Sequence, residues 1–186
     1  MLNFKIDIEK IDQIGSFSKE EREFRIKNLN YFNEVGFPNK RLEDWKFSDL
    51  REIVSKNFKN LHFESIKSKD TKIDLIKDFE HNYIIVENGE LISSNFNFED
   101  KNKIKIKKFL NESYSDKKET NSLINLNHAL SENGYFLQVD ENYKFKKILV
   151  IYHLFTDDLN ENFLNSKNKI IIGKFSEVHT LDLVIN

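Results

Sequence analysis

The sequence contains no cysteine among its 186 residues. This absence excludes disulfide bonds, thiolate nucleophiles and every zinc or iron–sulfur site that needs cysteine ligands from this chain. Proline and tryptophan each occur once, at Pro38 and Trp45, and glycine occurs five times. Because the glycines are far apart, the sequence has neither a glycine-rich phosphate loop nor a dinucleotide-binding fingerprint.

Long apolar runs and a surplus of either charge are also missing. The first residues lack the apolar core of a signal peptide, and no segment approaches the ~20 apolar residues needed to cross a bilayer. We therefore expect a soluble, cytoplasmic protein. The 29 basic and 31 acidic residues give a formal net charge of −2. Without a basic surplus, nucleic acid is a poor candidate for a partner, and no membrane contact is expected.

What the sequence does contain is enough apolar material for a core. Hydrophobic residues make up 39% of the chain, and 17 of its residues are phenylalanine. This length and composition favour one or two domains. We expect three consecutive regions: a helical N-terminal region over 1–80, a small β and loop region over 81–120, and a helix followed by strands over 121–186.

The first region has clear helix signals. Ser18-Lys19-Glu20-Glu21 is a capping box and predicts a helix that runs to about Val35 and ends at Gly36. A short second helix is predicted over about 49–57, and weak helical character over 71–79. Residues 1–15 are expected to be partly loose. The apolar face predicted for the long helix consists of Phe24, Leu29, Tyr31, Phe32 and Val35.

Strand patterns begin after residue 80. Strands are predicted over 83–86 and 90–93, joined by Asn88-Gly89 as a type I′ hairpin turn. Lysine and isoleucine alternate over 101–108, which favours a half-exposed strand; a basic binding patch is the alternative reading. A helix is predicted over 121–131. Further strands are predicted over 135–139, 147–155, 170–173 and 177–185.

The segment Gly36–Leu50 organises the N-terminal region, because it holds a Gly-Phe-Pro break followed by Trp-Lys-Phe. It resembles the N-terminal signature of SufD, in the SufB/SufD family of iron–sulfur cluster assembly proteins. That pattern reads approximately Gly-(Leu/Phe)-Pro-Thr-x-Arg-x-Glu-x-Trp-Lys-Tyr-Thr-x-Leu. The positions that fit it are Gly36, Phe37, Pro38, Arg41, Glu43, Trp45, Lys46 and Leu50. Related residues, namely Asn39, Phe47 and Ser48, replace the usual Thr, Tyr and Thr.

Trp45 is the residue of this segment that we expect to anchor the helical head. A large aromatic ring removes much apolar surface from water when it is buried. Phe47 and Leu50 are expected to add to the same apolar surface. We therefore predict that Trp45→Ala lowers the free energy of unfolding by about 3–5 kcal/mol, as for a packed core aromatic.

The last third of the chain is similar to the same family. The family has a helix of the type Leu-Asn-x-Ala, then Asp-Gly-aromatic-x-(Leu/Ile)-x-Val, and later Arg-x-Leu-Ile-x-x-Gly-x-x-Ser-x-Val. The matching positions are Leu126, Asn127, Ala129, Gly134, Phe136, Val139, Ile171, Gly173, Ser176 and Val178. Asn133, Lys147 and Lys169 stand where the family tends to have Asp, Pro and Arg. The resemblance covers residues 16–186.

The resemblance implies an α+β fold, in which an N-terminal helical head is followed by a β-rich region that forms the start of a right-handed parallel β-helix. It also implies a non-enzymatic scaffold subunit that acts with SufB-like and SufC-like proteins. This chain is expected to bind no cofactor, since the family's complex handles the clusters and uses ATP through SufC. SufD-like chains are larger, so we expect an N-terminal portion that lacks the later functional regions.

No catalytic, cofactor-binding or metal-binding residue is predicted. The histidines have neither the i, i+4 nor the His-x-His spacing of a metal site, although His153 and His179 both fall in predicted strands. We expect all five to be surface or core residues: His62, His81, His128, His153 and His179. The acidic cluster of Asp157, Asp158 and Glu161 lacks the spacing of an EF-hand and is expected to be a solvated loop.

Two alternative functions stay open. The first is an intracellular α+β protein-interaction module without a catalytic site, whose apolar edge strand docks a partner. The second is a β-helical carbohydrate-active enzyme, which needs carboxylates clustered on successive strands. Glu177 and Asp182, which share one predicted strand, do not supply that cluster.

Overall fold

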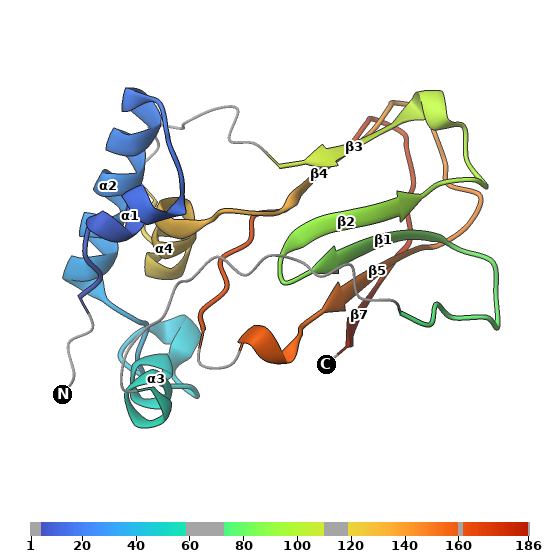
Figure 1. Ribbon diagram of the computed structural model, residues 1–186. Helices are drawn as coiled ribbons and strands as arrows, with labels where there is room; N and C mark the ends of the chain where they lie inside the picture. Colours follow the sequence, from blue (N-terminus) through green and yellow to red (C-terminus); the bar gives the residue numbers. More distant parts are fainter. Residues whose placement is uncertain (1–4, 59–72, 110–118, 160–161, 186) are drawn as a thin grey trace. The chain divides into compact units, whose positions relative to one another are not determined.

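A computed structural model describes residues 5–58, 73–109, 119–159 and 162–185. Helices and strands are both present, so the expected α+β class is confirmed at that level (Figure 1). The chain forms two compact units. The helical unit comprises 1–65, 111–132 and 161–165, and the β unit comprises 66–110, 133–160 and 166–186. This division differs from the three consecutive regions expected, because the helix after residue 121 joins the N-terminal helices.

The helical unit contains four described α-helices: α1 (Glu9–Ile14), α2 (Lys19–Val35), α3 (Leu50–Asn57) and α4 (Ser122–Leu130). The predicted start and end of α2 are confirmed. Ser18 Oγ accepts a hydrogen bond from Glu21 N at 3.2 Å, and the Gly36 N–H donates to Phe32 O. Gly36 has a φ of 73°, a conformation that glycine adopts without strain. In the described part of the chain, no helix has both the length and the apolar character needed to cross a membrane.

The helices α2 and α4 pack against each other, and a buried arginine joins them. Arg25 is 3% exposed, and its Nη1 donates to Ala129 O at 2.9 Å and to Ser131 O at 3.0 Å. These are carbonyl groups at the end of α4, which have no partner within the helix. Glu21 accepts from the same guanidinium at 3.0 Å, so the buried charge is paired. The buried face of α2 therefore includes a charged residue that its apolar pattern does not predict.

Residues 1–15 are expected from the sequence to be partly loose, and 1–4 lie outside the described residues. Over 5–15 the chain is packed, because α1 buries Ile11 completely and Ile6 is 6% exposed. The helix predicted over 71–79 is wrong where it is described. The described part of the predicted helix over 71–79, namely 73–79, contains no helix. Instead, Ile76 N donates a hydrogen bond to Tyr152 Oη at 3.1 Å, so this segment is bonded to β5.

The apolar anchor of the Gly36–Leu50 segment is Phe37, and Trp45 is only half-buried. Phe37 is 4% exposed and packs edge-on against Phe32, with ring centroids 5.1 Å apart. Trp45 ends a 3₁₀ turn, η1 (Glu43–Trp45), that buries none of its residues, and Phe47 is 89% exposed. The expectation that Trp45 and Phe47 anchor the core is therefore wrong. The Gly-Phe-Pro break directs Phe37 into the core, and the following turn leads back to the surface.

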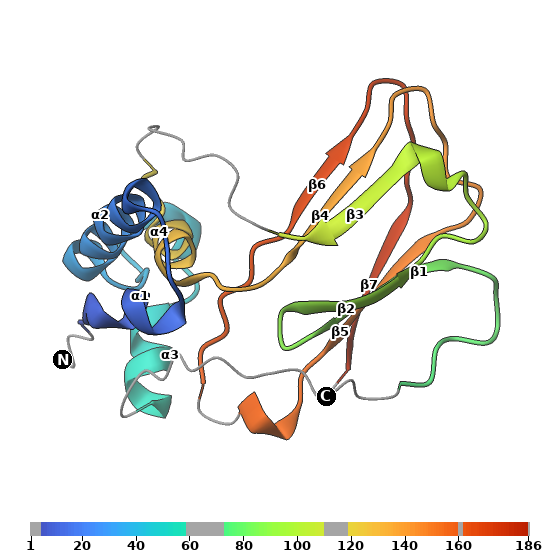
Figure 2. The same ribbon diagram turned by 45° about the horizontal axis from the view of Figure 1, so that its top comes forward.

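The β unit contains two sheets, which Figure 2 shows separately. One sheet has the order β2-β1-β5-β7. Its strands are β1 (Asn82–Glu87), β2 (Glu90–Asn95), β5 (Leu149–Leu154) and β7 (Thr180–Ile185). The other has the order β3-β4-β6. Its strands are β3 (Ile104–Lys108), β4 (Tyr135–Val139) and β6 (Lys169–Ile172). Residues of both sheets form the core of the β unit, in which Ile84, Leu137 and Leu149 are fully buried.

The predicted hairpin is confirmed. β1 and β2 are antiparallel and are joined by Asn88 and Gly89, which have φ values of 47° and 81°. Positive φ at both central residues is the requirement of a type I′ turn. Apart from β1 with β2 and β3 with β4, the strand pairs are parallel: β1 with β5, β4 with β6, and β5 with β7.

The parallel pairs β4–β6 and β5–β7 place one segment of the chain beside the next. Phe136 pairs with Lys169 and Val139 with Ile172, an offset of 33 residues. The isolated bridges Asn133–Ser166 and Lys144–Glu177 have the same offset. For β5 and β7 the offset is 31, since Leu149 pairs with Thr180. Residues 166–185 thus repeat the path of residues 133–154.

The turns inside these two segments also correspond. Asn142 and Phe175 both have positive φ, at 58° and 61°, and they lie 33 positions apart. Asn142 N donates to Lys174 O at 2.8 Å, and Ser176 Oγ donates to Asp140 O at 2.7 Å. The second turn therefore lies directly on the first.

Candidate functional site

The most unusual surface of the β unit is the outer side of its last two strands. All four residues of β6 are exposed, and its isoleucines 170, 171 and 172 are 40–42% exposed. On β7 and the turn before it, Val184 is 66% exposed and Phe175 is 82% exposed. We call β6 and β7 with their connecting turn the C-terminal edge. A strand sequence this apolar is typical of strands that are covered by a neighbour.

The C-terminal edge also presents unpaired backbone. Within the described residues, β6 lies at the end of the order β3-β4-β6 and β7 at the end of β2-β1-β5-β7. Each strand is therefore bonded on one side only, and the N–H and C=O groups of its other side are available to an added strand. The edge combines main-chain hydrogen-bonding groups with apolar side chains, which is the chemistry of strand-to-strand recognition.

Two histidine–carboxylate pairs involve residues of these strands and their neighbours. His153 Nε2 lies 3.0 Å from Asp182 Oδ1, and His179 Nε2 lies 2.9 Å from Glu177 Oε1. Hydrogen bonding to His179, with Lys144 at 3.2 Å adding to it, lowers the pKa of Glu177. The two histidines are thus paired with different carboxylates rather than with a common ligand.

These carboxylates do not form a glycosidase-type pair. Glu177 and Asp182 are each bonded to a histidine, as described above. Burial raises the pKa of Tyr135 to about 12, with the charge of Asp182 contributing, so that this phenol stays protonated at neutral pH.

The remaining histidines have structural surroundings where they are described. His81 is 9% exposed; its Nδ1 lies 3.0 Å from Phe79 O and its Nε2 lies 2.8 Å from Tyr152 Oη. Tyr152 Oη also accepts from Ile76 N at 3.1 Å, so this chain of bonds fastens 76–81 to β5. His128 lies edge-on to Phe24 in the helical unit. His62 lies outside the described residues.

Glu99 is a buried carboxylate with several hydrogen-bond donors around it. It is 7% exposed and accepts hydrogen bonds from Asn82 Nδ2 and Tyr143 Oη at 2.8 Å, and from the backbone N–H groups of Lys146 and Lys147 at 2.9 and 3.1 Å. Burial acts against ionisation, but these bonds together hold the pKa of Glu99 below its ordinary value. Through the Lys146 and Lys147 N–H groups, Glu99 fastens the entry of β5 to the connection between β2 and β3.

The predicted acidic loop is confirmed where it is described. Asp157 and Asp158 lie in a 3₁₀ turn, η3 (Asp157–Leu159), and are exposed. Glu161 lies outside the described residues. Among the residues that the structure describes, no group of three or more His, Cys, Asp or Glu side chains is arranged to hold a metal ion.

The sequence predicted the strands of the C-terminal edge and an open last strand over 177–185, but it did not predict the exposure of the isoleucines at 170–172. Isoleucine runs such as 170–172 read as buried strands, and only the pairing shows that their outer side has no neighbour in the described part of the chain. The signal in the sequence that could have revealed this arrangement is the correspondence between 133–154 and 166–185, with its matching turns.

No family model matches this chain, and no curated protein matches it.

Proposed function

We propose that this chain is a scaffold subunit of iron–sulfur cluster assembly that resembles SufD and works in the cytoplasm with SufB-like and SufC-like proteins. In this proposal the chain catalyses no reaction and holds no cofactor of its own. Its contribution is a surface on which other proteins assemble. The motif Gly36–Leu50 and the matching positions in the last third of the chain support the family assignment.

The observation that carries the proposal is the parallel pairing of β4 with β6 and of β5 with β7. With their stacked turns, these pairs are what the first two rungs of a parallel β-helix require. We propose that β6 and β7 are the second rung of a right-handed parallel β-helix, whose first rung is formed by β4 and β5. The antiparallel strands β2 and β3 then belong to the cap of that helix.

The C-terminal edge supports an assembly role. It offers unpaired backbone together with five apolar side chains that are at least 40% exposed, at positions 170, 171, 172, 175 and 184. We infer that a SufB-like protein adds a strand to this edge. Such a contact gains main-chain hydrogen bonds and apolar burial at the same time.

Co-expression tests this proposal. Tagged residues 1–186 are expected to retain a SufB-like protein through affinity purification, and Ile171→Glu combined with Val184→Glu is expected to abolish the retention. Phe47→Glu, at a more exposed apolar position in the helical unit, serves as the control and leaves the retention intact. Absence of a SufB-like protein from the purified complex, with the chain folded by circular dichroism, contradicts the proposal.

The SufC-like ATPase provides a second readout. The family resemblance assigns the helices that hold the ATPase to the later part of SufD-like chains. We therefore expect residues 1–186 alone to fail in a pull-down of a SufC-like protein. Strong retention of the ATPase by this chain contradicts the proposed division of labour.

A protein-interaction module outside iron–sulfur assembly is the second candidate, and the same exposed edge favours it. The two functions differ in their partner. Genes for SufB-like, SufC-like or cysteine desulfurase proteins beside this gene favour the first function, whereas a complete operon of unrelated function favours the second.

A further inference from the structure

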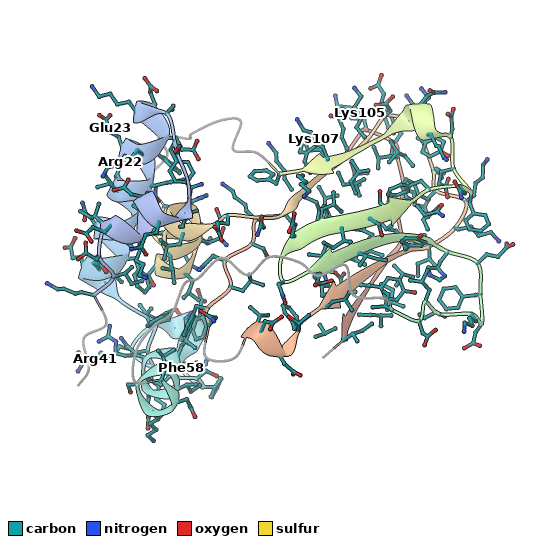
Figure 3. The ribbon with its side chains drawn as sticks, viewed as in Figure 1. Arg22, Glu23, Arg41, Phe58, Lys105 and Lys107 are labelled. Atoms are coloured by element: carbon teal, nitrogen blue, oxygen red, sulfur yellow. The ribbon has the colours of Figure 1, made fainter. Side chains whose placement is uncertain are left out.

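The lysine run over 101–108 plays no part in the proposed function. It forms the 3₁₀ turn η2 (Lys101–Lys103) and the strand β3, which lies at the end of the order β3-β4-β6 within the described residues. Lys105 and Lys107 alternate with Ile104 and Ile106. Successive side chains of a strand point to opposite faces, so the lysines share one face of β3 and the isoleucines share the other. Figure 3 shows Lys105 and Lys107 on this strand.

A cavity of about 310 Å³ lies on the isoleucine side of β3, between β3 and the end of β2. Its apolar wall consists of Phe96, Ile104 and Ile106, and Ser94, Asn97 and Lys101 contribute polar groups. Beyond the cavity, Lys108 forms an ion pair with Glu90 at the start of β2. The cavity is therefore bordered by the edge strands of both sheets, and it has the size of one or two apolar side chains.

The backbone of β3 leaves hydrogen-bonding groups free on its outer side. Lys103 O accepts from Asp140 N at 2.9 Å, and Phe109 N donates to Gly134 O at 3.0 Å. Because bonded positions alternate in an antiparallel pair, the odd-numbered residues of β3 face β4. The N–H and C=O groups of Ile106 consequently point away from β4, where an added strand is able to bond them.

The charge at this edge is not balanced. Lys103 lies 3.9 Å from Asp140, Lys108 pairs with Glu90, and Lys107 lies over the Phe136 ring at 5.3 Å. Lys101 and Lys105 are exposed and have no carboxylate partner among the described residues. In a chain whose net charge is −2, this local excess of positive charge selects an acidic ligand.

We propose that the free edge of β3 and the cavity beside it bind an extended peptide in which acidic and apolar residues alternate. A peptide added beside β3 bonds the backbone of Ile106. Its apolar side chains enter the cavity next to Ile104 and Ile106, and its acidic side chains lie on the opposite face, next to Lys105. Side chains on one face of any strand are about 6.5–7 Å apart. The acidic and apolar side chains of the peptide therefore have the same spacing as the lysines and isoleucines of β3.

A labelled seven-residue peptide of alternating glutamate and valine is the probe. Fluorescence anisotropy with residues 1–186 is expected to show saturable binding that weakens as salt is added. Lys101→Gln combined with Lys105→Gln should weaken binding roughly tenfold, since it removes from this edge two positive charges that have no carboxylate partner among the described residues. Lys146→Gln combined with Lys174→Gln removes the same charge elsewhere in the β unit and should leave binding unchanged.

The cavity and the backbone bonds have their own tests. Ser94→Leu fills the cavity and is expected to weaken binding, with the fold checked by circular dichroism. A probe that is N-methylated at every second residue loses strand hydrogen bonds and is expected to bind at least tenfold more weakly. Full affinity of that probe overturns the proposed strand addition.

Two further outcomes overturn the proposal. Equal binding of an oligothymidine, or of a peptide with the same residues but contiguous glutamates, shows an unselective anion surface. No binding of the alternating peptide shows that the lysines only protect the edge strand from pairing.

Discussion

Glu99 shows how a single buried carboxylate is kept ionised in this protein. Desolvation raises the free energy of the charged form, and four donor groups around the carboxylate more than compensate for it. Two of those donors are consecutive backbone N–H groups, at Lys146 and Lys147. The position of β5 therefore depends on one charge in the connection between β2 and β3.

Glu99→Gln is expected to lower the free energy of unfolding by about 2–3 kcal/mol at pH 7, because an amide cannot accept all of these bonds. The folded-state pKa lies below the ordinary value of 4.5. The stabilisation is therefore complete above that value and is lost as the pH falls through the folded-state pKa. Urea unfolding between pH 3 and pH 7 should show the difference between the two proteins closing at low pH.

Glu141→Gln is the control for that measurement. Glu141 is exposed, and its side chain has no hydrogen bond or ion pair among the described residues. Its substitution should change neither the stability nor its pH dependence. A Glu99→Gln difference that is the same at every pH contradicts the assigned role of the charge.

The burial of Phe37 and Trp45 leads to a second residue-scale prediction. Phe37→Ala removes a ring that is 4% exposed from the helical core and should cost about 3–5 kcal/mol of unfolding free energy. Trp45→Ala, at a half-buried surface position, should cost about 1–2 kcal/mol, less than the sequence alone suggested. Denaturant unfolding measures both, and a larger loss for Trp45 than for Phe37 contradicts this ranking.

At the scale of elements, two glycines allow consecutive segments of the β unit to lie close together. A Cβ atom on Gly134 would overlap the carbonyl oxygen of Lys167, and one on Gly173 would overlap the backbone N of Glu141. Both obstacles are backbone atoms, which a side-chain rotation cannot move. The stacking of the turns therefore requires glycine at these two positions.

Gly134→Ala and Gly173→Ala are each expected to lower the free energy of unfolding by about 2–4 kcal/mol, because the two stacked segments must separate. Gly15→Ala provides a matched control, since the nearest atoms to its added Cβ lie 3.7 Å away on a side chain. That control should be nearly neutral in thermal unfolding. Equal effects of all three substitutions contradict the stacking argument.

At the scale of the whole molecule, the C-terminal edge determines how the protein behaves in solution. Exposed isoleucines beside unpaired strand backbone favour pairing with another chain. We expect purified residues 1–186 to associate as the concentration increases. Ile171→Lys combined with Val184→Lys should reduce the association, because a charge on an edge strand opposes pairing.

Light scattering over a range of concentrations measures this association. Phe47→Lys is the control. It replaces an aromatic side chain of the helical unit that is more exposed than Ile171 and Val184, and it should leave the association unchanged. A clean, stable monomer of the unaltered chain at high concentration contradicts the prediction for the C-terminal edge.

Local signals predicted most of the elements because their causes are local. Ser18 with Glu21 marked the start of α2, Gly36 its end, and Asn88-Gly89 the hairpin. The predicted strand over 135–139 coincides with β4. The resemblance to the SufB/SufD family also came from short motifs alone, and the function that it implies stays a prediction.

Burial and pairing could not be read in the same way, because they depend on neighbours that are distant in the sequence. Arg25 is buried because the end of α4, about a hundred residues later, supplies acceptors for its guanidinium. Ile171 is exposed because β6 is bonded on one side only within the described residues. The sequence by itself determined where helices, strands and turns begin; the tertiary structure alone decided which of their faces meet, since apolar burial and strand pairing are satisfied between segments rather than within them.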